Sequence, residues 1–294
     1  MKGQFGGLIT AMVTPFDRDG NLDLGGAEKL AAWLIDNGSD GLVITGTTGE
    51  GPTVTDAEKG ELWRAIVGAV GDRCTVIAGT GTNDTAHSVQ LTAEAEKAGC
   101  DAALVVTPYY SRPPQAGLLG HFKAVAASTS LPIVLYDIPS RTGRKIEHRT
   151  LLELAGVENI VAVKDACGDV QGAARLVAEA PESFEVYCGN DADTLPWLAI
   201  GARGVVSVAS HVAGLRMAEL MNAFWAGEVD RARILNAGLL GVYEAMSVAP
   251  KPISVKAAVG MLGHPVGAPR LPLTEATPEE TEKIRRALVS AGLL

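Results

Sequence analysis

The chain has 294 residues, of which 47% are hydrophobic and 20% charged, so it can bury a large core and is not a disordered protein. Its formal net charge of −9, with no cluster of Lys and Arg, excludes nucleic acid as an expected partner. No apolar run approaches the ~20 residues that span a bilayer, and the N-terminal apolar stretch stops at Pro15, so we expect no membrane contact, no signal peptide and a cytoplasmic location.

Eight short apolar segments rich in β-branched residues predict strands. They cover 8–13, 41–44, 75–78, 102–106, 133–136, 160–164, 184–188 and 204–208. The segments between them have helical spacing, as in 24–35, where apolar residues recur every three or four positions. Thr55 with Glu58 fits a helix-capping box, and helix C-terminal stops are expected at Gly38, Gly71, Gly99 and Gly201.

Strands that alternate with helices imply parallel pairing with right-handed crossovers. Eight such units over about 225 residues predict an α/β fold of the (β/α)8 TIM-barrel type, with residues 1–226 as the catalytic barrel domain. A doubly wound open sheet is the competing fold. It usually has fewer strands, and the dinucleotide-binding motif GxGxxG is incomplete in GTGTND, which starts at Gly79.

The strand pattern stops near residue 226, and helical patterns follow over about 228–247, 251–262 and 278–291. The last of these begins with Thr277, Pro278 and Glu280, which fit a capping box with proline at the first helical position. We therefore expect residues 227–294 to form a C-terminal helical extension that serves oligomer packing.

Lys164 differs from the other nine lysines, which lie in amphipathic or loop contexts where a solvated charge is expected. It closes the apolar segment 160–164, and strand alternation puts it on the face of Ile160 and Ala162. In a barrel that face is the interior, and the carboxyl end of a strand is where active sites gather. A desolvated lysine with a lowered pKa can attack a ketone. A structural role, such as an ion pair with Asp165, remains the alternative.

Two further strand ends carry residues suited to the same chemistry. Tyr136 lies at the end of the preceding strand, where its phenol can move protons or simply pack in the core. Arg141 follows in a segment bounded by Pro139 and Gly143, where it can bind a carboxylate or form a surface salt bridge. The turn at 46–51, GTTGEG, offers two hydroxyls and several N–H groups to a small carboxylate, although a plain tight turn would have the same composition.

Cysteines and histidines do not form a metal-binding pattern. There is no CxxC pair among Cys74, Cys100, Cys167 and Cys188, and the five histidines form no HxxxH or HExxH pair. We expect free, mostly buried thiols, no metal and no cofactor.

Four motifs occur in order along the chain, namely GTTGE at 46–50, VTPYYSRPP at 106–114, YDIPSRTG at 136–143 and VKDACGD at 163–169. Together they resemble the dihydrodipicolinate synthase branch of the pyruvate-dependent class I aldolase and N-acetylneuraminate lyase family. The resemblance covers essentially the whole chain and includes 189–191, 201–208 and the terminal AGLL. It implies a lyase that condenses pyruvate with L-aspartate 4-semialdehyde, the first committed step of lysine and diaminopimelate biosynthesis.

The resemblance also implies roles for individual residues. Lys164 looks like the Schiff-base lysine, and its proton relay looks like Tyr136, Thr47 and Tyr110. Thr47 and Thr48 would hold the carboxylate of pyruvate, and the backbones of Gly189 and Val206 would line the pocket. Arg141 would hold the carboxylate of the second substrate. Because the family's second relay tyrosine, here Tyr110, enters the neighbouring subunit's site, a homodimer at least is implied, and a homotetramer built as a dimer of dimers is expected.

The resemblance includes an allosteric site for lysine. Asn83 and Tyr109 match that site, but Lys59 and His87 stand where inhibited relatives tend to have His and Glu. His87 in place of Glu removes an acceptor for the ammonium group of the effector, and Lys59 in place of His adds a cation. We therefore expect weak inhibition by lysine.

Two alternatives accompany the synthase interpretation. Another pyruvate-dependent aldolase, of the sugar-acid or N-acetylneuraminate lyase type, is opposed by Arg141, which neuraminate lyases lack at this position. A non-catalytic sensor that binds a 2-oxo acid is opposed by the set Lys164, Tyr136, Thr47 and Tyr110, because a sensor needs no proton relay.

Overall fold

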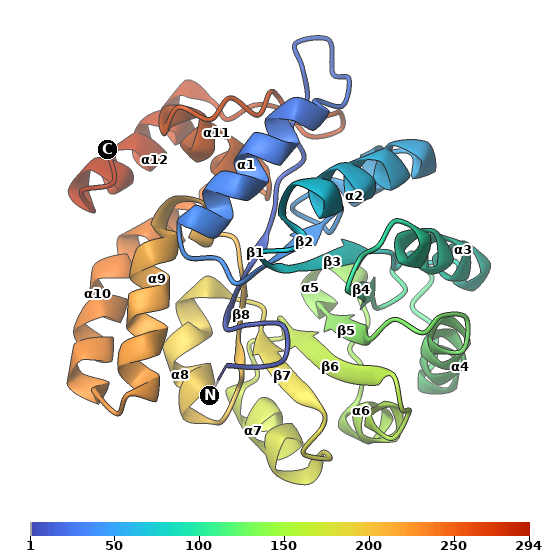
Figure 1. Cartoon of the computed structure of the whole chain (residues 1–294). Coiled ribbons are helices and arrows are strands. Elements are labelled where there is room, and N and C mark those ends of the chain that lie inside the picture. The colour runs from blue at the N-terminus through green and yellow to red at the C-terminus, as the bar shows by residue number, and fades with distance from the viewer. Residues whose placement is uncertain (1) are drawn as a thin grey trace.

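A computed structural model describes residues 2–294 and contains a closed barrel of eight parallel strands in the order β1 to β8 (Figure 1). The strands are β1 Leu8–Ala11, β2 Gly41–Ile44, β3 Thr75–Gly79, β4 Ala102–Val106, β5 Ile133–Asp137, β6 Ile160–Asp165, β7 Glu185–Cys188 and β8 Gly204–Ser207. The ring closes where β1 pairs with β8. The predicted (β/α)8 barrel is therefore confirmed, and the open sheet is excluded.

Helices surround the barrel on its outside, except for the short α5, which lies at the end of β5 inside the ring of outer helices (Figure 1). They are α1 Leu24–Asp36, α2 Asp56–Val70, α3 Thr85–Lys97, α4 Gln115–Ala126, α5 Pro139–Thr142, α6 His148–Ala155, α7 Val170–Glu179, α8 Thr194–Ala199 and α9 Ser210–Trp225. The predicted capping box is present at α2, where the Thr55 hydroxyl accepts from the N–H of Glu58. Gly38, Gly99 and Gly201 follow helix ends with positive φ, whereas Gly71 caps α2 with right-handed φ.

Three further helices make up the C-terminal extension, α10 Val229–Ala245, α11 Ile253–Met261 and α12 Pro278–Ser290. The capping box at Thr277 and Glu280 is also present. The extension packs on the barrel, because Leu239, Val255 and Ile284 belong to the same buried apolar cluster as the strands. The chain thus has one continuous core, and α10 lies against α9 (Figure 1).

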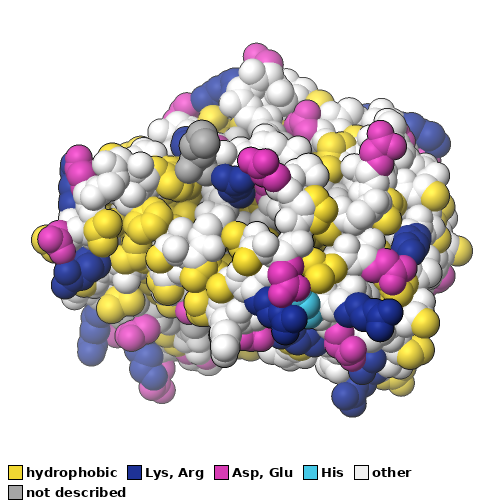
Figure 2. Space-filling model, turned by 90° about the horizontal axis from the view of Figure 1, so that it is seen from below, with side chains coloured by type: hydrophobic (Ala, Val, Ile, Leu, Met, Phe, Trp, Pro, Cys, Tyr) yellow, Lys and Arg dark blue, Asp and Glu magenta, His cyan; other side chains and the backbone are white. Residues whose placement is uncertain are grey.

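The molecular surface carries charges of both signs. On the face shown in Figure 2, Lys and Arg alternate with Asp and Glu, and no broad basic field is visible. Hydrophobic side chains gather on the side where Figure 1 places α10. That helix exposes Val229, Ile234 and Leu240. None of the helices within residues 2–294 is both long and apolar enough to cross a bilayer.

Candidate active site

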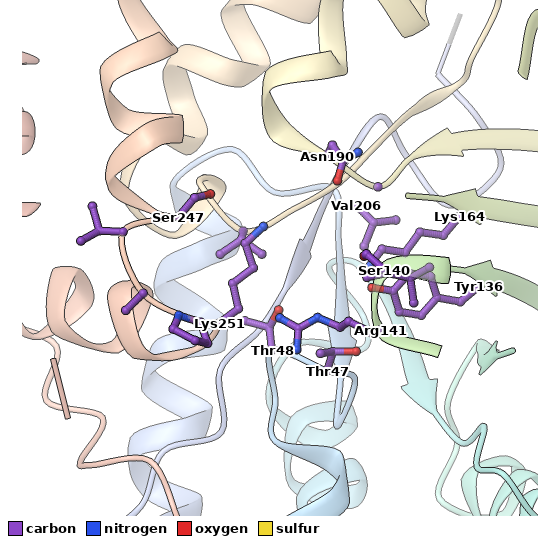
Figure 3. Close-up of a pocket in the computed structure, with 16 residues that line it drawn as sticks. Thr47, Thr48, Tyr136, Ser140, Arg141, Lys164, Asn190, Val206, Ser247 and Lys251 are labelled. Carbon is purple, nitrogen blue, oxygen red and sulfur yellow. The ribbon is translucent and has the colours of Figure 1, made fainter. Parts of the chain in front are cut away.

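A cavity of about 440 Å³ opens at the carboxyl ends of the barrel strands (Figure 3). Seven of the predicted site residues line it: Thr47, Thr48, Tyr136, Arg141, Lys164, Gly189 and Val206. A further wall comes from residues 247–251, between α10 and α11. The C-terminal extension, expected only to pack against other subunits, therefore forms part of this pocket.

Lys164 is buried at the end of β6, with 6% of its surface exposed. It pairs in register with Tyr136 of β5, and its Nζ lies 4.0 Å from the centre of the Tyr136 ring. Within residues 2–294 it forms no ion pair, and the carboxylate of Asp165 instead accepts the backbone N–H of Cys167. The alternative of a Lys164–Asp165 ion pair is therefore wrong. Burial lowers the pKa of Lys164 to about 8, with the charge of Asp191 opposing the shift.

The lowered pKa predicts how the expected reaction of Lys164 with a 2-oxo acid should depend on pH. Only the neutral amine attacks a carbonyl, and with a pKa of about 8 roughly a tenth of Lys164 is neutral at pH 7. The rate of adduct formation with pyruvate should rise with pH up to about 8 and then level off. Borohydride trapping at a series of pH values measures it. A rate that keeps rising towards the ordinary lysine pKa would contradict the prediction.

Tyr136 faces the same cavity, beside the turn that follows β2. Burial raises the pKa of its phenol, and the Thr47 hydroxyl and the charges of Arg141 and Lys251 oppose that shift. The phenol is therefore protonated at neutral pH and lies between Lys164 and a hydroxyl. This arrangement suits the passage of a proton to or from a group bound on Lys164.

The turn after β2 presents free N–H groups to the cavity. Within the described residues, the N–H groups of Thr47 and Thr48 donate to no protein acceptor, whereas Glu50 N donates to Thr47 O at 3.2 Å and Gly51 N to Gly46 O at 3.1 Å. Gly51 is required here, because a Cβ at that position would lie 2.3 Å from the carbonyl oxygen of Thr45. Two free donors and two hydroxyls make this turn a suitable cradle for a carboxylate.

A buried ion pair holds the same turn in place. Glu50, in a left-handed conformation, pairs with Lys256 of α11 at 2.6 Å, and their side chains are 1% and 3% exposed. The backbone N–H of Arg270 donates to the second oxygen of Glu50 at 2.8 Å, and the Arg270 guanidinium binds Glu58. That contact lowers the pKa of Glu58 to about 2. The expectation that all lysines other than Lys164 are solvated is wrong for Lys256 and for Lys59, which is also buried.

The cavity has polar residues that the sequence pattern did not single out, namely Ser140, Asn190, Ser247 and Lys251. Arg141 reaches it from α5, a single helical turn rather than a loop, and forms no ion pair with any residue of 2–294. Figure 3 shows Arg141 extending from one wall towards Lys251 on the other. The predicted helix 251–262 begins at Lys251, but α11 begins at Ile253, so Lys251 stands between two prolines in the turn that precedes the helix.

Tyr110 lies outside this cavity. Its side chain is 90% exposed, and its φ of 70° is unfavourable for a residue with a side chain. It lines a neighbouring cleft instead of the cavity that holds Lys164. That cleft is also lined by Thr47 and Tyr136, so within one chain Tyr110 shares a cleft with these two residues but does not line the cavity that holds Lys164.

The neighbouring cleft, of about 750 Å³, contains Asn83, Tyr109, Lys59 and His87. It also contains Asp56, whose carboxylate lies 2.8 Å from His87 Nε2 and 3.4 Å from Lys59 Nζ. Asp56 is therefore already paired with the two residues that depart from the family pattern, and Glu50, the other acidic residue that lines the cleft within residues 2–294, is paired with Lys256.

Comparison with known proteins identifies the family. A model of the dihydrodipicolinate synthetase family matches residues 4–291. The 4-hydroxy-tetrahydrodipicolinate synthase of Moorella thermoacetica is 54% identical over 291 residues, which are 99% of this chain and 100% of that protein. The crystal structure of dihydrodipicolinate synthase from Bacillus anthracis has a TM-score of 0.96 and 46% identity, and the match covers 99% of both chains. The structure of the enzyme from Cyanidioschyzon merolae with lysine bound has a TM-score of 0.97 and 43% identity, again over 99% of both chains. The chain therefore belongs to the dihydrodipicolinate synthetase family.

Proposed function

We propose that Lys164 forms the Schiff base in a 4-hydroxy-tetrahydrodipicolinate synthase. The enzyme is a lyase that condenses pyruvate with L-aspartate 4-semialdehyde in the biosynthesis of lysine and diaminopimelate. The observation that carries the residue assignment is a buried lysine that forms no ion pair within residues 2–294, lies in register with Tyr136 and has a pKa of about 8.

The chemistry follows from the groups around the cavity. The carboxylate of pyruvate binds the N–H groups and hydroxyls of Thr47 and Thr48, which leaves its ketone carbon near Lys164. Nζ attacks C2, and water leaves to give an iminium. Tyr136 assists removal of a proton from C3, and the resulting enamine attacks the aldehyde carbon of the second substrate. The amine of that substrate then attacks C2, forms the ring and releases Lys164.

Arg141 supports the choice of second substrate. Its guanidinium lines the cavity without an acidic partner, so it is free to bind the carboxylate of the semialdehyde. Gly189 and Val206 line the pocket through their backbones, and a Cβ at Gly189 would lie 2.6 Å from the Cβ of Ala166.

A coupled assay with two acceptors tests the function. With pyruvate as donor, L-aspartate 4-semialdehyde should be consumed rapidly, and N-acetylmannosamine should give no product above the rate without enzyme. Turnover of the sugar with no turnover of the semialdehyde would contradict the proposal and favour a neuraminate lyase.

We further propose a homo-oligomer in which Tyr110 completes the proton relay of a partner subunit, and a tetramer as its full assembly. The exposed aromatic ring and the unfavourable backbone of Tyr110 support a partner at this surface. Tyr110→Phe should lower kcat by about 10²-fold, the ordinary contribution of a proton-transfer group, and leave the oligomer intact. Sedimentation velocity and steady-state kinetics measure both effects, and a fully active monomer would contradict this assembly.

The cleft beside the active site is proposed as a weak effector site. A lysine ammonium needs a free carboxylate, but Asp56 is already paired with Lys59 and His87. We expect half-inhibition by lysine only at millimolar concentrations or above, measured with saturating substrates. An inhibition curve with its midpoint well below millimolar lysine would contradict this expectation.

We also propose a cytoplasmic location, in keeping with the biosynthetic reaction.

A further inference from the structure

The active-site cavity is unusually positive for so acidic a protein. The chain has 34 Asp and Glu against 25 Lys and Arg, yet none of the residues that line the cavity within 2–294 is acidic. Three of them are basic, namely Lys164, Arg141 and Lys251, and none of the three forms an ion pair within the described residues. A cavity with unpaired cations and no carboxylate attracts anions.

Lys251 is built into the wall that the C-terminal extension contributes. It stands between Pro250 and Pro252, and the segment is fixed by hydrogen bonds from Ile253 N to Pro250 O and from Ala249 N to the Ser254 hydroxyl, both 2.9 Å long. The backbone position is therefore well defined, and the half-buried side chain lines the cavity. Its charge and that of Arg141 both act on the Tyr136 phenol, so the two cations lie near the same reacting group.

In the proposed mechanism, pyruvate does not contact the part of the cavity that Arg141 and Lys251 line. Its carboxylate binds the turn at Thr47 and Thr48, and its ketone reacts with Lys164. Arg141 and Lys251 lie on facing walls (Figure 3), and both line the neighbouring cleft as well as the cavity. They therefore border both the cavity and the cleft, where a second substrate can reach the bound enamine.

We propose that Lys251 is a specificity-determining residue that binds the carboxylate of the acceptor together with Arg141. This inference rests on the proposed function. The planar guanidinium can take two carboxylate oxygens side by side, and the ammonium adds a compact charge from the opposite wall. The pair selects aldehydes that carry a carboxylate over uncharged aldehydes of similar size.

Kinetics of Lys251→Met test the assignment, because methionine keeps most of the side-chain length and removes the charge. The KM for L-aspartate 4-semialdehyde should rise about tenfold, the usual effect of losing a hydrogen bond to a charged group. The KM for pyruvate and the yield of the borohydride-trapped pyruvyl adduct should stay within about twofold, because neither depends on the acceptor site. Lys251→Arg should restore most of the acceptor affinity.

Lys29→Met is the matched control. Lys29 is an exposed lysine of α1 without an ion pair, outside both cavities, so its replacement should change none of these constants. An acceptor KM in Lys251→Met within about twofold of the parent, or an equal rise in both KM values, would overturn the role of Lys251 while leaving Lys164 untouched. Absence of any adduct on the parent enzyme would overturn the proposed function itself and this inference with it.

Discussion

Lys164→Met should lower kcat/KM by at least about 10³-fold, because Lys251, the other lysine that lines the cavity within residues 2–294, lies on a different wall (Figure 3) and is not expected to replace the nucleophile. Methionine has a similar length and no charge, so it fits the buried position without leaving a cation or a large void. Lys164→Arg should be equally inactive, since a guanidinium stays protonated and does not attack a ketone. Steady-state assays with both substrates measure the loss.

Lys283→Met provides the control for this variant. Lys283 is an exposed lysine of α12, paired with Glu279 and remote from the cavity, so the activity should match that of the parent. A Lys164→Met protein that folds normally and keeps more than about a tenth of the parent kcat would show that Lys164 is not the nucleophile.

Lys256→Met should lower the free energy of unfolding by about 3–5 kcal/mol, because it leaves the buried carboxylate of Glu50 without its counter-ion. Since Glu50 is part of the turn that presents Thr47 and Thr48, the KM for pyruvate should also rise. Urea unfolding gives the stability and steady-state kinetics give the KM. Lys256→Met combined with Glu50→Gln should recover part of the lost stability, because the second change removes the unpaired charge.

The exposed ion pair between Lys283 and Glu279 is the control for the buried pair between Lys256 and Glu50. Its loss in Lys283→Met should cost less than about 1 kcal/mol, as for most solvent-exposed ion pairs. Equal, small losses for Lys256→Met and Lys283→Met would contradict a structural role of the buried pair. An unchanged KM for pyruvate in a destabilised Lys256→Met protein would contradict its link to the carboxylate cradle.

The barrel was predictable because each strand is a short β-branched run that is buried on both faces. The same regularity placed Lys164 and Tyr136 at neighbouring strand ends, and the observed register pairs them directly. The predicted strand limits differ from the observed ones by at most two residues, and those of β2 and β4 match. The first predicted strand, for example, extends to Val13, whereas β1 ends at Ala11.

The residues that the sequence did not reveal are those whose partners lie far along the chain. Glu50 and Arg270 are 220 positions apart, so no local sequence pattern predicts the hydrogen bond between them. The same is true of the burial of Lys256. Lys251 was missed for a related reason. The sequence pattern assigns it to the start of a helix over 251–262, where a solvated lysine is expected, and only the packing of the extension on the barrel places it in the cavity wall.

The most direct test of the central claim is mass spectrometry of the enzyme after treatment with pyruvate and borohydride, followed by peptide mapping. Reduction of the iminium should leave a stable pyruvyl adduct on the peptide that contains Lys164 and on no other lysine, including Lys251 and Lys256. The adduct should be absent when pyruvate or borohydride is omitted. An unmodified Lys164, or an adduct that maps to a different lysine, would contradict the Schiff-base mechanism.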